Sequence, residues 1–161
     1  MINFALQAIL IAVFIVVFCQ DTKDRMVYWF LYPICGMLCF AIQAAHVGFQ
    51  PALFNSLINL GFIAIILLSA YIYSVTVMKR PFINGSIGLG DVLLFLSLCF
   101  TFTTITFVIL FVFSLCFSLL LHLYLKNRSS HNNVPLAGHI SLFFSVVYIA
   151  SFFLEPKYLF A

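Results

Sequence analysis

The chain has 161 residues, of which 65% are apolar or aromatic and 7% are charged, and its formal net charge is +3. A soluble domain of this size could not cover so much apolar surface with seven basic and four acidic side chains. A bilayer solvates apolar side chains, provided that backbone amides and carbonyls are paired within helices or a closed barrel. Because the apolar runs are unbroken rather than alternating, they predict an all-α, multi-pass membrane protein.

Five apolar runs follow one another along the chain. They cover residues 2–20, 27–45, 53–77, 92–125 and 136–154. The first run has no basic segment before it and no small-x-small cleavage site after it, so we interpret it as a retained span and not as a signal peptide. Its 19 residues would form a helix of about 28 Å, close to the hydrocarbon thickness of a bilayer.

The fourth run is too long for one span. Its 34 residues would form a helix of about 51 Å, yet it contains no glycine or proline to mark a turn. Basic pairs follow the first, third and fourth runs: Lys23 and Arg25, Lys79 and Arg80, and Lys126 and Arg128. Short loops rich in Lys and Arg remain cytoplasmic. All three pairs share that side only if an even number of spans separates Arg80 from Lys126, so we expect this run to fold into two helices.

A threonine-rich stretch is the only candidate for the turn within the fourth run. It contains Thr101, Thr103, Thr104 and Thr106. The sequence therefore predicts a single transmembrane domain, residues 1–161, with six transmembrane helices and both termini on the non-cytoplasmic side of the inner (cytoplasmic) membrane. Three of the four acids then lie on the cytoplasmic face: Asp21, Asp24 and Asp91.

The segment that precedes Asp91 is rich in glycine, with three glycines in residues 85–90. Glycine permits backbone conformations and close approaches that other residues resist. Gly88 and Gly90 are therefore expected to let an extended substrate backbone, or another helix, approach the Asp91 carboxyl. The alternative is an N-terminal cap, in which Asp91 accepts hydrogen bonds from helix amides and the glycines turn the chain.

Asp21 ends the first apolar run on the same predicted face as Asp91. Two carboxyls that lie close together cannot both ionise cheaply, so such a pair shares one proton. One member can then activate a water while the other protonates a carbonyl oxygen. The alternative for Asp21 is a solvated acid that pairs with Lys23 or Arg25, and Asp24 fits that alternative better.

With these two aspartates the chain resembles the type IV prepilin peptidases, a family that includes the archaeal preflagellin peptidases. The family has one catalytic Asp at the cytoplasmic end of the first helix, before an apolar residue and a Pro-Asn or Pro-Asp pair, and a second in Gly-x-Gly-Asp. Residues 21–27 are similar to the first motif, with Val27 in the apolar position, and residues 88–91 match the second. Pro135, within residues 134–138, is similar to the family's Ile-Pro-Phe-Gly-Pro before the last helix.

Four positions depart from the family pattern. Tyr28 and Trp29 stand in place of the Pro-Asn pair, Leu93 in place of a frequent Lys, and Gly138 in place of the second Pro. None of these departures removes a catalytic carboxyl.

The resemblance implies an aspartic endopeptidase of the Gly-x-Gly-Asp type that removes the short leader of a prepilin-like or pseudopilin protein at the cytoplasmic face. Such proteins serve type IV pili and protein secretion. Asp21 and Asp91 would be catalytic, and the substrate would approach motif residues Gly88, Gly90, Val27 and Pro135. The expected partners are this substrate and the lipid bilayer, with no nucleic acid. Larger relatives have a zinc-binding insert and methylate the new N-terminus, and the chain has no room for that insert, so no methyltransferase activity is expected.

Neither a metal nor a cofactor is predicted. The cysteines all fall inside apolar runs and are expected to be buried small hydrophobic residues: Cys19, Cys35, Cys39, Cys99 and Cys116. The histidines show no metal-ligand spacing, and His139 is expected to make a polar contact at the start of a helix.

The sequence is also compatible with two other functions. Paired intramembrane acids also form proton or cation sites, so the chain could be a small transporter or channel subunit. A transporter would place its acids deeper in the membrane than the helix ends predicted here. The chain could also be an inactive assembly subunit of a pilus or secretion system.

Overall fold

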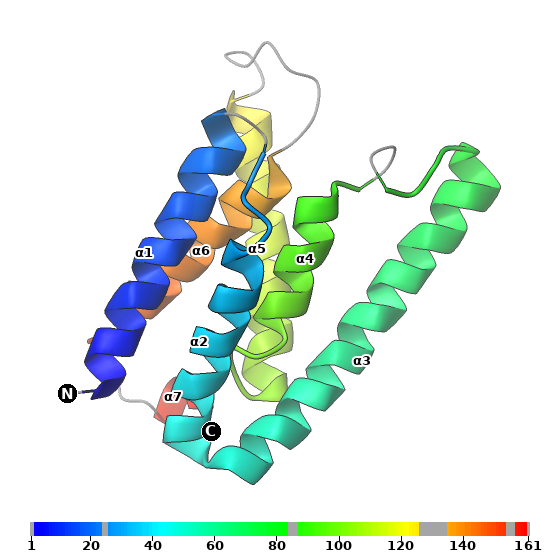
Figure 1. Ribbon diagram of the computed structural model, residues 1–161. Helices are drawn as coiled ribbons and strands as arrows, with labels where there is room; N and C mark the ends of the chain where they lie inside the picture. Colours follow the sequence, from blue (N-terminus) through cyan, green and yellow to red (C-terminus); the bar gives the residue numbers. More distant parts are fainter. Residues whose placement is uncertain (1, 24–25, 84–86, 126–134, 154–156, 161) are drawn as a thin grey trace.

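The protein folds into helices joined by short connections (Figure 1). This computed structural model describes residues 2–23, 26–83, 87–125, 135–153 and 157–160. In chain order the elements are α1 (Ile2–Lys23), α2 (Leu31–Val47), α3 (Phe49–Tyr73), the π-helical turn η1 (Ser74–Met78), α4 (Leu89–Leu98), α5 (Thr104–Leu125), α6 (Leu136–Ala150) and α7 (Lys157–Phe160). The described residues form no β-strand, which confirms the predicted all-α class.

A single residue joins α2 to α3. Gly48 has φ of 91°, a left-handed conformation that glycine adopts without a Cβ penalty. Pro33 and Pro51 lie in the first turns of α2 and α3, where a missing N–H removes no helical hydrogen bond. The helix α2 begins four residues after the start of its predicted run and ends two residues beyond it, whereas α3 begins four residues before its predicted run.

The fourth apolar run folds into two helices, as predicted, and α3 supports the turn between them. The turn lies between Leu98, where α4 ends, and Thr104, where α5 begins. Asn59 of α3 is fully buried, and its Nδ2 donates hydrogen bonds to the carbonyl oxygens of Cys99 (3.0 Å) and Phe102 (3.1 Å). Cys99 and Phe102 are fully buried, and buried backbone carbonyls that have left a helix need such partners.

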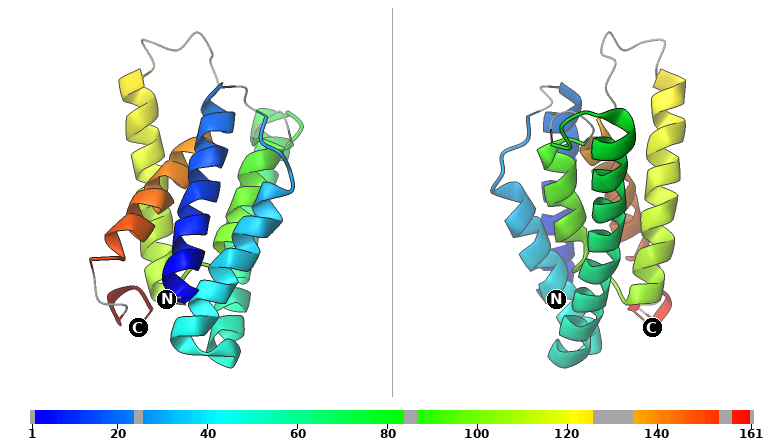
Figure 2. Two further views of the ribbon diagram at one scale, coloured as in Figure 1. Left: turned by 60° about the vertical axis from the view of Figure 1, so that its left-hand side comes forward. Right: turned by 90° about the vertical axis from the view of Figure 1, so that its right-hand side faces the viewer.

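The helices run alternately in opposite directions, so the helix ends that carry Asp21 and Asp91 lie at one end of the bundle. The C-terminal ends of α1, η1 and α5 lie toward the same end as the N-terminal ends of α2, α4 and α6 (Figures 1 and 2). Two of the predicted basic pairs are associated with this end, since Lys23 ends α1 and Lys79 follows η1. Lys126 and Arg128 lie outside the described residues. We call this end of the bundle the site end.

The hydrophobic core lies between α1, α2, α4, α5 and α6, while α3 diverges from the others toward its C-terminal end (Figure 1). Its largest fully buried side chains are aromatic: Phe14, Phe102, Phe107, Phe111, Phe144 and Tyr148. Cys35, Cys39 and Cys99 are also buried. Cys19 and Cys116 are exposed on the outside of the bundle, so the prediction of burial is wrong for these two.

Three helical segments among the described residues are long and apolar enough to cross a membrane: Phe4–Lys23, Phe49–Met78 and Thr104–Tyr124. The other apolar helices, α2, α4 and α6, have 17, 10 and 15 residues. At 1.5 Å per residue α4 is only about 15 Å long. The predicted number of six spans and the predicted sides of the termini stay predictions.

Candidate functional site

Asp21 of α1 and Asp91 of α4 meet at the start of α6. Asp21 Oδ2 accepts a hydrogen bond from the backbone N–H of Gly138 at an N···O distance of 2.5 Å. Asp91 Oδ1 accepts one from the N–H of Ala137 at 2.8 Å. The two carboxylates therefore bind successive amides of one helix turn, and they are close enough to interact electrostatically. The structure thus brings together the two aspartates that the sequence paired.

The first turn of α6 is well suited to hold negative charge. Its N–H groups have no acceptor within the helix. Ala137 and Gly138 are buried, so the two carboxylates accept the hydrogen bonds that water would otherwise accept. The positive end of the helix dipole also favours anions at this position. Pro135 precedes the helix, and its carbonyl oxygen accepts a hydrogen bond from the His139 N–H at 3.1 Å. We therefore interpret Pro135 as the residue that sets the start of α6.

Gly138 allows α6 to approach α1 closely. A Cβ atom at this position would lie 3.0 Å from Asp21 Oδ2 and 3.2 Å from Asp21 Cβ. Contacts that short are tighter than ordinary van der Waals packing. A proline at residue 138 could not make the contact with Asp21, since proline has no N–H to donate.

Gly88 and Gly90, which were expected to admit a substrate backbone, both contact other parts of the protein. The Gly88 N–H donates to Asp91 Oδ2 at 3.2 Å, the capping interaction that was the alternative reading. Gly90 lies in the first turn of α4, and a Cβ there would lie 2.7 Å from the Tyr32 hydroxyl oxygen. The space next to Gly90 is therefore filled by Tyr32.

Val27 lies in the connection from α1 to α2, where it is half-buried and packs against the hydrophobic core. The neighbouring Tyr28 and Trp29 are exposed, and the Tyr28 N–H donates to Gln20 Oε1 at 3.2 Å. This contact ties the connection to the last turns of α1. Asp24, the less favoured acid, lies outside the described residues.

Tyr32 is the site residue that sequence reasoning missed. It is the second residue of α2, and its side chain is only 2% exposed. Asp21 and Asp91 both interact electrostatically with its hydroxyl. A lone tyrosine in an apolar run gives no signal by itself, because its position beside both acids depends on the packing of α2 against α4.

His139 makes the polar contact predicted for it. It is buried, and its Nδ1 lies 3.2 Å from Ser118 Oγ of α5. This contact joins α5 and α6 beneath the start of α6. Within the described part of the chain, no three His, Cys, Asp or Glu side chains group together as candidate metal ligands. His131 lies outside that part.

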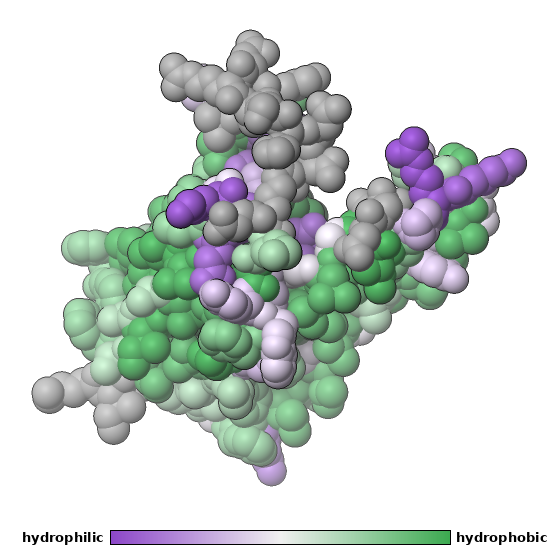
Figure 3. Space-filling view, turned by 45° about the horizontal axis from the view of Figure 1, so that its top comes forward, coloured by the Kyte–Doolittle hydropathy of each residue, from purple (hydrophilic) through white to green (hydrophobic). Residues whose placement is uncertain are grey.

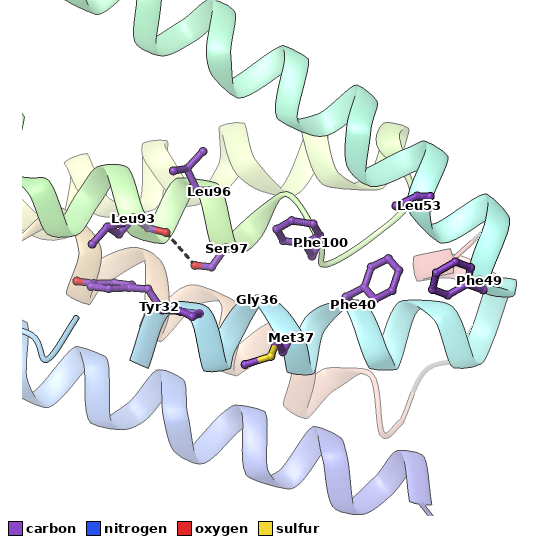
Figure 4. Close-up of a pocket in the computed structure, with 11 residues that line it drawn as sticks. Tyr32, Gly36, Met37, Phe40, Phe49, Leu53, Leu93, Leu96, Ser97 and Phe100 are labelled. Carbon is purple, nitrogen blue, oxygen red and sulfur yellow. Dashed lines mark hydrogen bonds between the residues drawn. The ribbon is translucent and has the colours of Figure 1, made fainter. Parts of the chain in front are cut away.

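An apolar pocket of about 530 Å³ opens between α2, α3 and α4 next to the site. Figure 4 shows Tyr32 and Leu93 at one end of the pocket and Phe49 at the other, with the Tyr32 hydroxyl directed away from Phe40 and Phe49. Hydrophilic residues gather at the site end of the molecule, whereas the helices below are covered by hydrophobic ones (Figure 3). The site therefore adjoins both a polar end and an apolar pocket.

The arrangement combines two interacting carboxylates, each only partly buried, with an adjacent apolar pocket. Two such carboxylates can hold one proton between them, and a shared proton supports general acid and general base roles on one substrate. No protein-family model, curated protein or solved structure matches the chain.

Proposed function

We propose that the chain is an aspartic membrane endopeptidase that removes the short N-terminal leader of type IV prepilin-like proteins. The observation that supports this most directly is the meeting of Asp21 and Asp91 on successive amides of α6. The two acids come from separate helices, α1 and α4, and both contact α6, an arrangement that a two-aspartate hydrolase could use. The resemblance to prepilin peptidases supplies the substrate class.

In the proposed reaction the pair starts with one proton. The ionised aspartate accepts a proton from water as the water oxygen attacks the scissile carbonyl carbon, and the protonated aspartate donates its proton to the carbonyl oxygen. The tetrahedral diol then collapses. One hydroxyl of the diol gives its proton to the aspartate that had protonated the carbonyl oxygen, as C=O reforms and the C–N bond breaks. The aspartate that had taken a proton from water protonates the leaving nitrogen. One water is consumed, and the pair returns to its starting state.

We further propose six transmembrane helices, with the site end on the cytoplasmic side of the inner membrane. The leader of a prepilin-like protein is basic and begins in the cytoplasm, so the peptidase site must face that side. The basic residues Lys23 and Lys79 at the site end support this orientation through the positive-inside tendency. Both termini of the chain would then lie on the opposite side.

The rival proposal, a transporter or channel subunit, is less well supported. Intramembrane ion sites use acids deep in the bundle, commonly beside broken helices. Asp21 lies in the last turn of α1 and Asp91 in the first turn of α4. Both acids are thus at helix ends, next to the polar end of the molecule.

The test is cleavage of a prepilin-like peptide, with a basic leader and an apolar helix, by the purified protein in lipid nanodiscs. Asp21→Asn and Asp91→Asn should each abolish cleavage, because each removes one half of the shared-proton pair. Asparagine keeps an oxygen that can accept the α6 amide, so both variants should fold. Asp24→Asn is the matched control and should keep substantial activity.

Three outcomes would contradict the proposal. A wild-type protein that cleaves no such peptide is not this enzyme. Cleavage that persists in Asp21→Asn or Asp91→Asn removes the two-aspartate mechanism. If Asp24 is essential and Asp21 is dispensable, the assignment of the first aspartate is wrong.

A further inference from the structure

Tyr32 has a buried hydroxyl that lacks a hydrogen-bond partner within the described part of the chain. The side chain is 2% exposed. Buried tyrosine hydroxyls usually have a partner, since leaving one unpaired costs free energy. An unpaired hydroxyl that lies inside a candidate active site is therefore a candidate contact for a bound substrate.

The position of this hydroxyl is fixed by α4. Without a Cβ, Gly90 leaves room for the Tyr32 hydroxyl oxygen, which would lie 2.7 Å from any Cβ added there. The next residue along α4 is Asp91, and the hydroxyl is within electrostatic range of both Asp91 and Asp21. Tyr32 also lines the apolar pocket between α2, α3 and α4 (Figure 4). The hydroxyl thus lies where the pocket meets the two acids.

We propose that Tyr32 is a third catalytic residue, whose hydroxyl donates a hydrogen bond to the carbonyl oxygen of the scissile peptide bond. This inference rests on the proposed peptidase function. A tyrosine hydroxyl is protonated at neutral pH and can donate. It gives up no proton in the reaction, so the proton balance between Asp21 and Asp91 is unchanged. Its hydrogen bond strengthens as negative charge develops on the carbonyl oxygen, which lowers the barrier to attack by water.

The proposal gives Gly90 a specific role. The lack of a side chain at Gly90 predicts close approach by a substrate backbone or another helix, and in the structure its missing Cβ makes room for the Tyr32 hydroxyl of α2. A Cβ at this position would lie 3.7 Å from Tyr32 Cζ, an ordinary contact. A methyl group at residue 90 therefore conflicts with the hydroxyl of Tyr32 and not with its ring.

The test measures kcat and KM for peptide cleavage by Tyr32→Phe, by Gly90→Ala and by the double variant. Tyr32→Phe should lower kcat by about 100-fold, the loss typical of one oxyanion donor, with little change in KM. Gly90→Ala should lower kcat similarly because the hydroxyl is displaced. In the Tyr32→Phe background, Gly90→Ala should cause no further loss, because phenylalanine has no hydroxyl to displace.

Tyr148→Phe is the matched control. Tyr148 is also fully buried, but it lies near the far end of α6. Its loss should leave kcat unchanged, whereas equal losses in Tyr148→Phe and Tyr32→Phe would show a general packing effect and overturn the inference.

The remaining outcomes separate this inference from the proposed function. If the wild type cleaves, Asp91→Asn is inactive and Tyr32→Phe keeps full kcat, the inference is wrong while the peptidase function stands. If Gly90→Ala costs the same in both backgrounds, the Tyr32 hydroxyl is not what Gly90 accommodates, which also refutes the inference. A wild type that does not cleave overturns both.

Discussion

Replacing Asn59 with leucine tests how the protein divides one 34-residue apolar run into two helices. The substitution keeps a buried side chain of similar size but removes the Nδ2 donor that binds Cys99 O and Phe102 O. Hydrogen bonds between helices in membranes contribute roughly 0.6–1.7 kcal/mol each. Losing two of them should therefore lower the free energy of unfolding by about 1–3 kcal/mol.

The assay is equilibrium unfolding of the purified protein in detergent micelles, with Asn55→Leu as the matched control. Asn55 lies one helical turn earlier in α3, is half-buried, and accepts a single 3.3 Å hydrogen bond from the Thr104 hydroxyl. Its replacement should cost under about 1 kcal/mol, because that hydroxyl can rotate to another acceptor. If Asn59→Leu is no less stable than Asn55→Leu, Asn59 does not hold the turn between α4 and α5.

Three further predictions concern the site and its orientation. Gly138→Ala should lower the rate of cleavage about 10-fold or more, because the added methyl group displaces Asp21. The control is Gly61→Ala, which should be harmless because no atom lies within 4 Å of the added Cβ. Equal activities of the two variants would show that α1 tolerates the methyl group at residue 138. Cleavage activity should be lost as pH rises far enough to remove the proton that the two acids share. EDTA should have no effect on activity. A loss of activity in EDTA that added zinc restores would contradict the aspartic mechanism. In a background without native cysteines, Lys79→Cys and Lys126→Cys should label from the cytoplasmic side and Thr103→Cys from the other; labelling of all three from one side would refute six spans.

The features that sequence predicted correctly depend on patterns that are local or can be counted. Long apolar runs fix the helices, and the parity of basic pairs required the run at residues 92–125 to be divided. The pairing of Asp21 with Asp91 followed from the ends of the helices on which they lie. None of these inferences required knowledge of which helix faces pack together.

The features that sequence did not predict all depend on contacts between distant segments. Asn59 is separated from Cys99 by 40 residues, and Gly138 from Asp21 by 117. The space beside Gly90 was predicted to be open to substrate, yet the packing of α2 against α4 fills that space with Tyr32. Identical residue types serve as linkers or close contacts in other folds, so composition alone could not assign these roles.

The start of α6 links stability to chemistry in one set of contacts. Its buried N–H groups at Ala137 and Gly138 need acceptors, and Asp21 and Asp91 provide them. A carboxylate has about four lone-pair sites, so an aspartate that accepts one or two amides can still bind a water. The amides also fix the orientation of each acid, which is what a pair needs to share one proton on a single substrate. The contacts that join α1 and α4 to α6 therefore also orient the two acids that the proposed hydrolysis would use. A substitution that keeps the acceptor oxygen while removing the acid separates the structural role from the proposed chemical one.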